Sequence, residues 1–323
     1  MILSRSPYRI TLGGGGTDRP DFYKKHGGFV VSMAIDKYIY LNLKADSLEK
    51  EIKVRYLNTE VVNRLDDLKH DRAREALRLH NLNESIEVNS CGDVPGQTGL
   101  GSSGSYLVAL LKAIRHHQKN YCSTQELAEE ACDIEINKLG LPVGKQDQYI
   151  AAFGGLRSLS INASGKVKVE AVKLDSKSLS NLTNNLHIYF LKKKRNASDI
   201  LSKQHCDLEG NEDRLLKIKE MGYRTLEMLE SSNFDEYGLM LDEYWRLKKE
   251  FSPDMSFSLA DKIYSELKNR FGILGGKIIG AGGGGFLMVY ANKKHTEIEK
   301  FMQQNNIVRL NYEPDNEGSK ILF

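Results

Sequence analysis

The chain has 323 residues, 40% hydrophobic and 28% charged, with a formal net charge of +3 at pH 7, which excludes a disordered or fibrous protein. Its length exceeds that of one hydrophobic core, so two packed lobes or one large α/β domain is expected. Acidic residues nearly balance basic ones, so nucleic acid is not an expected partner, whereas a small anionic substrate is compatible.

The cysteines are widely spaced and form no C-x-x-C pair, which indicates neither a zinc site nor a disulfide framework. The N-terminal residues contain no apolar signal region, and apolar runs such as 106–111 are too short to span a membrane. We therefore expect a cytoplasmic protein with reduced thiols and no membrane partner.

Alternating apolar and polar residues predict strands over 1–12 and 28–45. An amphipathic segment over 71–80 and a strand over 85–91 lead into a glycine-rich loop. Helical spacing follows directly over 106–118. The N-terminal part of the chain is therefore expected to be rich in sheet.

A second helix is predicted to begin at Ser123, because Ser123 and Glu126 form a capping-box pattern, and to end at Gly140. Residues 154–172 alternate again, which predicts a hairpin that turns near 162–165. The sheet pattern therefore returns after the helices.

The second half begins with a predicted buried strand at 186–191 and continues with helical periodicity over 197–271. Two strands are expected on either side of the glycine run 280–285, followed by a helix near 294–305 and a short final strand. The helical stretch is predicted to be interrupted near Asn211, 231–233 and 252–253.

The glycine-rich loop at 92–105, which precedes the helical spacing of 106–118, does not match the common nucleotide motifs. Gly96 and Gly101 have Walker A spacing, but Ser102 stands where the lysine belongs. Gly99, Gly101 and Gly104 match the dinucleotide fingerprint, yet no strand with an acidic end follows. Glycines before a helix N-terminus still favour phosphate binding. A flexible turn that caps a core helix is an equally good interpretation of this loop alone.

Two further glycine clusters favour phosphate binding over a simple turn. Residues 13–16 follow a strand and precede Thr17 and Asp18, and residues 280–285 contain more glycine than a two-residue turn requires. Glycine is entropically costly in a folded chain. We therefore expect the backbone at these clusters to approach a ligand or another loop closely.

Three motifs in order, SPYRITLGGGGTD, PGQTGLGSSGS and GAGGGG, resemble those of the GHMP kinases, named for galactokinase, homoserine kinase, mevalonate kinase and phosphomevalonate kinase. The segment GKQDQYIAAFGG adds to this resemblance, which covers nearly the whole chain. It implies an α+β fold with two lobes, mixed sheets and a helical block in the C-terminal half. We place the N-terminal lobe at 1–185 and the C-terminal lobe at 186–323.

The resemblance also implies a substrate class. Arg9 stands where the mevalonate branch usually has lysine, which favours the sugar kinases. The glycines at 13–16, the Asp147-Gln148 pair and the RNASDIL run at 195–201 are most similar to the heptose 7-phosphate kinases. Arg19, where an apolar residue is typical, and the basic run 192–194 depart from that pattern.

The resemblance implies ATP and Mg²⁺ as cofactors and assigns the catalytic residues. Asp147 would be the base, and the Arg9 guanidinium beside it would hold the carboxylate ionised and stabilise the migrating phosphoryl group. Ser103 and Glu135 would bind Mg²⁺, with Ser102 as the alternative to Ser103. The residues expected to bind the nucleotide are Pro95, Gly96, Gly99, Leu100, Gly101, Ser102, Ser103 and Gly104.

The substrate would lie beside the first glycine cluster, where Asp18 would accept hydrogen bonds from sugar hydroxyls, supported by Thr17 and Gly16. A phosphate already on the sugar would need fixed cations, for which Arg195 is the first candidate. Lys193 and Arg19 are further candidates. Solvated helix, turn and surface positions are the ordinary alternative for each of these charged residues.

These motifs favour a kinase that phosphorylates the anomeric hydroxyl of D-glycero-D-manno-heptose 7-phosphate, in nucleotide-activated heptose synthesis for surface polysaccharide. A galactokinase-like or fucokinase-like enzyme acting on a free sugar is the alternative within the class. A non-catalytic sugar and ATP sensor on the same fold is the alternative from another class.

Overall fold

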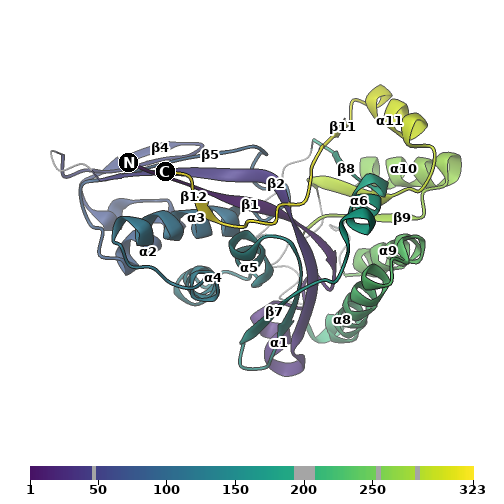
Figure 1. The fold of residues 1–323 in the computed structure, drawn as a ribbon, viewed down its shortest axis with the longest axis horizontal. Coiled ribbons are helices and arrows are strands. Elements are labelled where there is room, and N and C mark those ends of the chain that lie inside the picture. Colours follow the sequence, from purple (N-terminus) through teal and green to yellow (C-terminus); the bar gives the residue numbers. More distant parts are fainter. Residues whose placement is uncertain (46–48, 193–207, 252–255, 281–283) are drawn as a thin grey trace.

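The computed structural model of the protein describes residues 1–45, 49–192, 208–251, 256–280 and 284–323. Two β-sheets organise this part of the chain. Figure 1 shows them side by side, the larger sheet with its helices on the left and the smaller sheet with its helices on the right.

The larger sheet has the strand order β12-β1-β2-β5-β3-β4, and β6 and β7 extend it from β2. Its pairs are antiparallel except for β3 with β5. The predicted strands 1–12, 28–45 and 85–91 and the hairpin of 154–172 are confirmed. The strands are β1 Ile2–Gly13, β2 Gly28–Ala45, β3 Ile52–Arg55, β4 Thr59–Val62, β5 Ile86–Gly92, β6 Leu156–Ile161, β7 Val167–Ala171 and β12 Lys320–Ile321.

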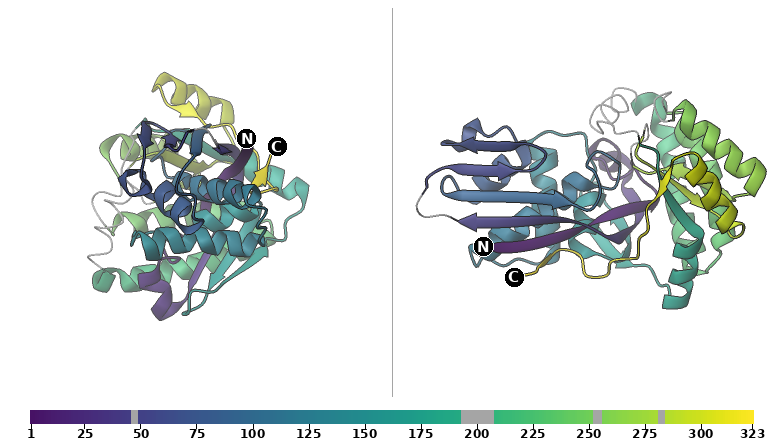
Figure 2. Two further views of the ribbon diagram at one scale, coloured as in Figure 1. Left: turned by 90° about the vertical axis from the view of Figure 1, so that its left-hand side faces the viewer. Right: turned by 90° about the horizontal axis from the view of Figure 1, so that it is seen from above.

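Helices cover one face of this sheet, and its other face lies open in the view from above (Figure 2). The apolar side chains of α3 pack between the helices and the larger sheet, where Leu107, Leu110 and Ile114 are fully buried. The helical elements of this region are α1 Pro20–His26, the 3₁₀ turn η1 Leu65–Asp67, α2 Asp71–Leu79, α3 Ser102–His117, α4 Thr124–Cys132, the π-helical segment η2 Asp133–Lys138 and α5 Gln146–Phe153.

The helix predicted from Ser123 has the expected capping box, in which Ser123 and Glu126 bond each other's backbone N–H. It does not continue as one α-helix, because η2 follows α4 directly. Such π turns insert an extra residue in the helical ladder. Here the consecutive residues Ile134 and Glu135 are both buried.

The smaller sheet has the order β11-β8-β10-β9 with antiparallel pairs. It confirms the strand at 186–191 and the two strands that flank the glycine run. The elements are α6 Ser176–Asn185, β8 Leu186–Phe190, α8 Leu208–Glu230, α9 Phe234–Lys249, α10 Ser258–Glu266, the π-helical η4 Leu267–Phe271, β9 Gly275–Ile278, β10 Phe286–Tyr290, α11 His295–Gln304 and β11 Val308–Arg309.

The helical block is confirmed, and it breaks between α8 and α9 at 231–233 as predicted. The predicted interruption near Asn211 is wrong, because α8 runs through it. The Asn211 side chain accepts a hydrogen bond from Arg214 Nη1 (2.7 Å) within the helix instead of capping a new one. The start of the predicted block, 197–207, lies outside the described residues.

The last residues return to the first sheet, where β12 pairs with β1. Leu3 N donates to Phe323 O (2.8 Å), so the two termini lie together, as Figure 1 shows. The other strands of the larger sheet lie before residue 185. The division at 185 stays a prediction.

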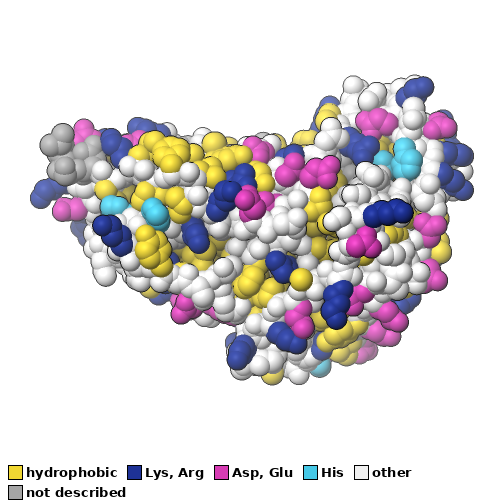
Figure 3. Space-filling view, viewed as in Figure 1, with side chains coloured by type: hydrophobic (Ala, Val, Ile, Leu, Met, Phe, Trp, Pro, Cys, Tyr) yellow, Lys and Arg dark blue, Asp and Glu magenta, His cyan; other side chains and the backbone are white. Residues whose placement is uncertain are grey.

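The charged side chains of both signs are mixed on the surface (Figure 3), as the modest net charge implies. The face in Figure 3 shows basic and acidic side chains interspersed over its whole width. Within the described ranges, no helix is both long enough and apolar enough to cross a membrane. The three described cysteines, Cys91, Cys122 and Cys132, have free thiols.

Candidate active site

The second glycine loop ends at the N-terminus of α3, one of the central helices under the larger sheet. Gly101 is the N-cap and has a left-handed backbone (φ 81°), and Gly99 also has positive φ (92°). Ser102 and Ser103 open the helix, so their N–H groups have no partner within it. Their hydroxyls have no hydrogen-bond partner among the described residues. This helix end is suited to an anionic group.

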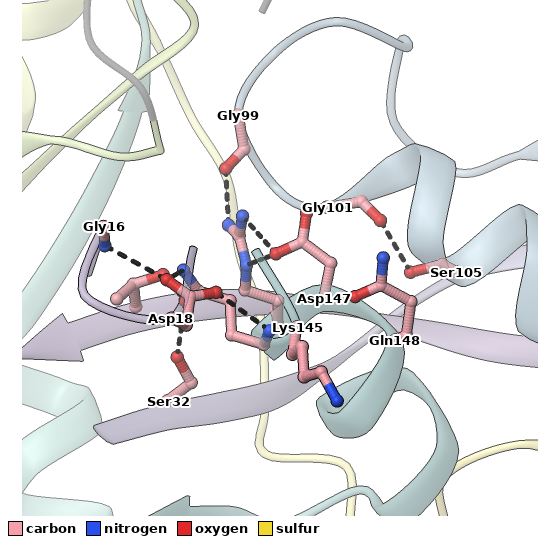
Figure 4. A network of polar contacts seen from close by, with 12 residues as sticks. Gly16, Asp18, Ser32, Gly99, Gly101, Ser105, Lys145, Asp147 and Gln148 are labelled. Atoms are coloured by element: carbon pink, nitrogen blue, oxygen red, sulfur yellow. Dashed lines mark hydrogen bonds and ion pairs between the residues drawn. The ribbon is translucent and has the colours of Figure 1, made fainter. Parts of the chain in front are cut away.

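Arg9 and Asp147 form an ion pair directly beside this helix end (Figure 4). Arg9 lies on β1 and Asp147 in the first turn of α5. Arg9 Nε and Nη2 lie 2.8 and 2.7 Å from the same oxygen, Asp147 Oδ1, and Arg9 Nη1 donates to Gly99 O at 2.6 Å. Asp147 Oδ2 has no hydrogen-bond partner in the described part of the chain. One carboxylate oxygen is thus held by arginine, and the other is an available acceptor.

The glycines at 101 and 104 permit this arrangement. A Cβ at Gly101 would lie 3.3 Å from Asp147 Oδ2, and a Cβ at Gly104 would lie 2.7 Å from the Asp147 Cβ. The contact at Gly104 is closer than real Cβ atoms come without displacing a neighbour, and the contact at Gly101 is tight. By contrast, a Cβ at Gly96 would meet no atom within 4 Å. Glycine at 101 and 104 therefore allows α3 to approach the Asp147 side chain.

Asp18 lies on the other side of Asp147 and joins the first glycine cluster to the start of α5. Its carboxylate accepts hydrogen bonds from Gly16 N (3.2 Å), Gln146 N (3.0 Å) and Gln146 Nε2 (3.3 Å). Burial raises the pKa of Asp18, and Asp147 acts in the same direction, while the N–H of Gln146 opposes it. The side chain is 1% exposed, so in this structure it positions the residue before Asp147.

Thr17 is fully buried and closes the turn of the first glycine cluster. Its hydroxyl donates towards Gly14 O (2.8 Å) and Phe29 O (2.9 Å), and it accepts from Phe29 N (3.1 Å). It therefore supports the loop that carries Gly16 and Asp18, as expected of a supporting residue. Direct contact of these three residues with a sugar stays a prediction.

Gln146 is a positioning residue that the sequence did not indicate. Its Oε1 accepts from Thr11 Oγ1 (2.6 Å) on β1 and from Ser32 Oγ (3.1 Å) on β2. With its bonds to Asp18, this side chain fastens the start of α5 to the sheet. Its position next to Asp147 in the sequence was the one feature that could have indicated this role.

Glu135 lies in η2, 1% exposed, and both of its oxygens have protein partners. Arg72 Nε donates to Oε1 (2.7 Å) and Gln148 Nε2 donates to Oε2 (2.5 Å). Each carboxylate oxygen has a further lone pair, and carboxylate and hydroxyl oxygens are of the kind that Mg²⁺ binds, so the donor chemistry is compatible with the ion. Joint binding of Mg²⁺ by Ser103 and Glu135 stays a prediction. No cluster of three or more His, Cys, Asp or Glu side chains suited to a metal occurs among the described residues.

The third glycine cluster, between β9 and β10 of the smaller sheet, meets the second one, which precedes α3. A Cβ at Gly285 would lie 2.0 Å from Thr98 O, so only glycine permits this contact. This confirms the expected close approach of one glycine loop to another at Gly285. Residues 281–283 lie outside the described part of the chain, as do Arg195 and Lys193, the candidate phosphate-binding residues.

Comparisons with known proteins agree with this fold. Residues 68–155 match the family model of the GHMP kinases N terminal domain. The chain is 28% identical to D-glycero-alpha-D-manno-heptose 7-phosphate kinase of Campylobacter jejuni subsp. jejuni serotype O:2, over 95% of both proteins. It is 22% identical to galactokinase of Thermotoga neapolitana, over 90% of this chain and 89% of that protein.

Among solved structures, D-glycero-D-manno-heptose 1-phosphate kinase from Bacteroides thetaiotaomicron superposes with a TM-score of 0.81 at 23% identity. The match covers 100% of this chain and 99% of the other. The protein is therefore a small-molecule kinase, a phosphotransferase with an alcohol group as acceptor. Residues 68–155 match the N-terminal domain of the GHMP kinases, and the expected α+β fold is confirmed.

Proposed function

We propose that the protein transfers the γ-phosphoryl group of ATP to the anomeric hydroxyl of D-glycero-D-manno-heptose 7-phosphate and forms the 1,7-bisphosphate. The product would enter nucleotide-activated heptose synthesis for surface polysaccharide in the cytoplasm. The similarity to the Campylobacter heptose 7-phosphate kinase over 95% of both chains supports this substrate. The name of the Bacteroides structure specifies a 1-phosphate instead, so the position of the transferred group must be measured.

The observation that best supports this reaction is that the two oxygens of the Asp147 carboxylate have different surroundings. Oδ1 is held by Arg9, and Oδ2, beside Gly101 at the start of α3, is available to a hydroxyl. In the proposed reaction Oδ2 accepts the hydroxyl proton as the oxygen attacks phosphorus. The Arg9 guanidinium stabilises the phosphoryl charge because it lies between Asp147 and the glycine loop.

The backbone N–H groups of the 95–104 loop and of the first turn of α3 would hold the triphosphate. Ser103, with Ser102 as the alternative, and Glu135 would hold Mg²⁺, which supplies positive charge to the phosphates when bound. Arg72 and Gln148 orient the Glu135 carboxylate for that task.

Release of ADP, followed with a coupled assay, tests the proposal on a panel of heptose 7-phosphate, the same heptose without phosphate, galactose and fucose. We expect turnover to be fastest with the heptose 7-phosphate, and ³¹P NMR of the product should show a new anomeric phosphate. A protein that turns over only unphosphorylated sugars would instead be a free-sugar kinase, which the galactokinase similarity favours as the second candidate.

A sugar and ATP sensor without catalysis is the remaining alternative. Such a protein would bind both ligands in calorimetry and release no ADP with any sugar of the panel. The presence of Asp147, Glu135 and Ser103 in the chain argues against it.

A further inference from the structure

Two lysines from the second lobe lie against the first glycine cluster, just ahead of Thr17 and Asp18. Lys277 is on β9, and Lys248 is on α9 one turn beyond Tyr244. Lys277 Nζ donates to Leu12 O at 3.3 Å, and Lys248 Nζ donates to Gly15 O at 3.0 Å. Both ammonium groups therefore contact the segment 12–15, where β1 ends and the glycine cluster begins, although they come from different elements.

The Tyr244 ring lies close to both lysines. The ring centroid is 4.2 Å from Lys277 Nζ and 5.9 Å from Lys248 Nζ, and the Tyr244 hydroxyl donates to Gly15 O (3.3 Å). Lys277 faces α9 because Gly275, two residues earlier on the strand, packs against the same helix. The two lysines therefore lie where β9, α9 and the first glycine cluster meet.

The neighbouring arginines have carboxylate partners and the lysines do not. Arg9 pairs with Asp147 and Arg19 pairs with Asp21, whereas no carboxylate of the described residues forms an ion pair with Lys248 or Lys277. Burial lowers the pKa of Lys248 to about 8; Arg19 also lowers it and Asp18 raises it. Burial, with Lys248 and Arg9 nearby, lowers the pKa of Lys277 well below its usual range.

Buried cations without an anionic partner are costly, and carbonyl oxygens and an aromatic ring compensate them only partly. Each ammonium has three donors, and the loop carbonyls use one of each. A phosphate dianion would supply the missing negative charge to both lysines. The predicted nucleotide loop, 95–104, is a different segment, which makes the acceptor the more suitable source of this phosphate.

We propose that Lys248 and Lys277 form the subsite that binds the phosphate group already carried by the sugar substrate. This inference rests on the proposed function and specifies how a phosphorylated acceptor is distinguished from a free sugar. It assigns that task to residues of β9 and α9 instead of Arg195, Lys193 or Arg19.

The test compares Lys248→Met and Lys277→Met, which keep the side-chain length and remove the charge, with the unchanged protein. We expect the KM for heptose 7-phosphate to rise roughly tenfold to a hundredfold, as the loss of a charged hydrogen bond implies. The KM for ATP should stay unchanged, and Lys248→Arg should recover most of the affinity. Lys249→Met is the matched control, because Lys249 is the next residue of α9, is 40% exposed and pairs with Asp261 (3.5 Å).

A second measurement needs no turnover. Inorganic phosphate, added to the nucleotide-free protein, should raise the melting temperature of the unchanged protein and of Lys249→Met, but not of Lys248→Met. If Lys277→Met does not fold, Lys248→Met and Lys248→Arg carry the test, because Lys248 is less buried than Lys277.

The outcomes separate this inference from the proposed function. Turnover of heptose 7-phosphate with an unchanged KM in both methionine variants would overturn the subsite and leave the function standing. A rise confined to the KM for ATP would also overturn it. Turnover of free sugars alone, with phosphate stabilisation that depends on Lys248, would overturn the proposed function and support an anion subsite at these lysines.

Discussion

Arg9 and Asp147 lie 138 residues apart in sequence, yet two guanidinium nitrogens of Arg9 contact one oxygen of Asp147. The third nitrogen holds Gly99 O, so the same side chain fixes both the carboxylate and the glycine loop. The Arg9 side chain is 6% exposed and the Asp147 side chain 25%, so the aspartate is the more accessible member of the pair.

Replacing Asp147 by asparagine should lower kcat by about a hundredfold or more, because the amide cannot accept the hydroxyl proton. ATP binding, measured by calorimetry, should change little. Asp133→Asn is the control, since Asp133 lies on the neighbouring η2 and bonds only to Asn137 among the hydrogen bonds described (2.8 Å). Unchanged turnover in Asp147→Asn would show that the hydroxyl proton leaves by another route.

Two glycines of the same loop should respond differently to alanine. Gly104→Ala places a Cβ 2.7 Å from Asp147 Cβ, so we expect a loss of roughly 1–3 kcal/mol in stability and a lower kcat. Gly96→Ala meets open space in the folded protein, so stability should hold while the KM for ATP rises. Urea unfolding and steady-state kinetics on both variants check this. Equal stability of the two variants would refute the packing role of Gly104.

Arg72→Met should destabilise the protein by about 3 kcal/mol, because it leaves the buried Glu135 carboxylate without its charged partner. The concentration of Mg²⁺ needed for half-maximal activity should also change, since the carboxylate loses its fixed orientation. Arg78→Met on the same helix should have little effect, because the Arg78 side chain is 43% exposed. An unfolding curve for Arg72→Met that coincides with that of Arg78→Met would contradict this view.

His187 makes stability depend on pH. Burial, with Arg309 and His295 nearby, lowers its pKa from 6.5 to about 3. Between these values the unfolded chain binds a proton that the folded protein does not, so the free energy of unfolding falls on acidification by up to about 1.4 kcal/mol per pH unit. Its ring nitrogen Nε2 lies 2.8 Å from His295 Nδ1.

His187→Gln should therefore flatten the decline in stability between pH 6.5 and pH 4, measured by urea unfolding at a series of pH values. His117→Gln replaces an exposed histidine and should keep the original slope. A slope that is the same in all three proteins would mean that His187 does not resist protonation in the folded state.

The sequence by itself determined the features that depend on neighbours along the chain. The alternation of 28–45, the capping box at Ser123 and the helical spacing after the second glycine loop all follow from local periodicity and backbone chemistry. The short elements α1, β3, β4 and β11 were not predicted, because few residues carry too weak a pattern. Helix α6 was not predicted either. The order of the glycine motifs, with the segment GKQDQYIAAFGG, indicated the resemblance to the GHMP kinases.

Only the tertiary structure decided which side chains meet. Glu135 pairs with Arg72, 63 positions away, and Lys277 lies beside Tyr244 and Lys248 of another element. Periodicity states which face of a strand or helix is buried, but it does not state which other element covers that face. The glycines at 101 and 104 illustrate the difference. From the sequence they suggested space for a ligand, whereas in the structure the Asp147 side chain lies where their Cβ atoms would be.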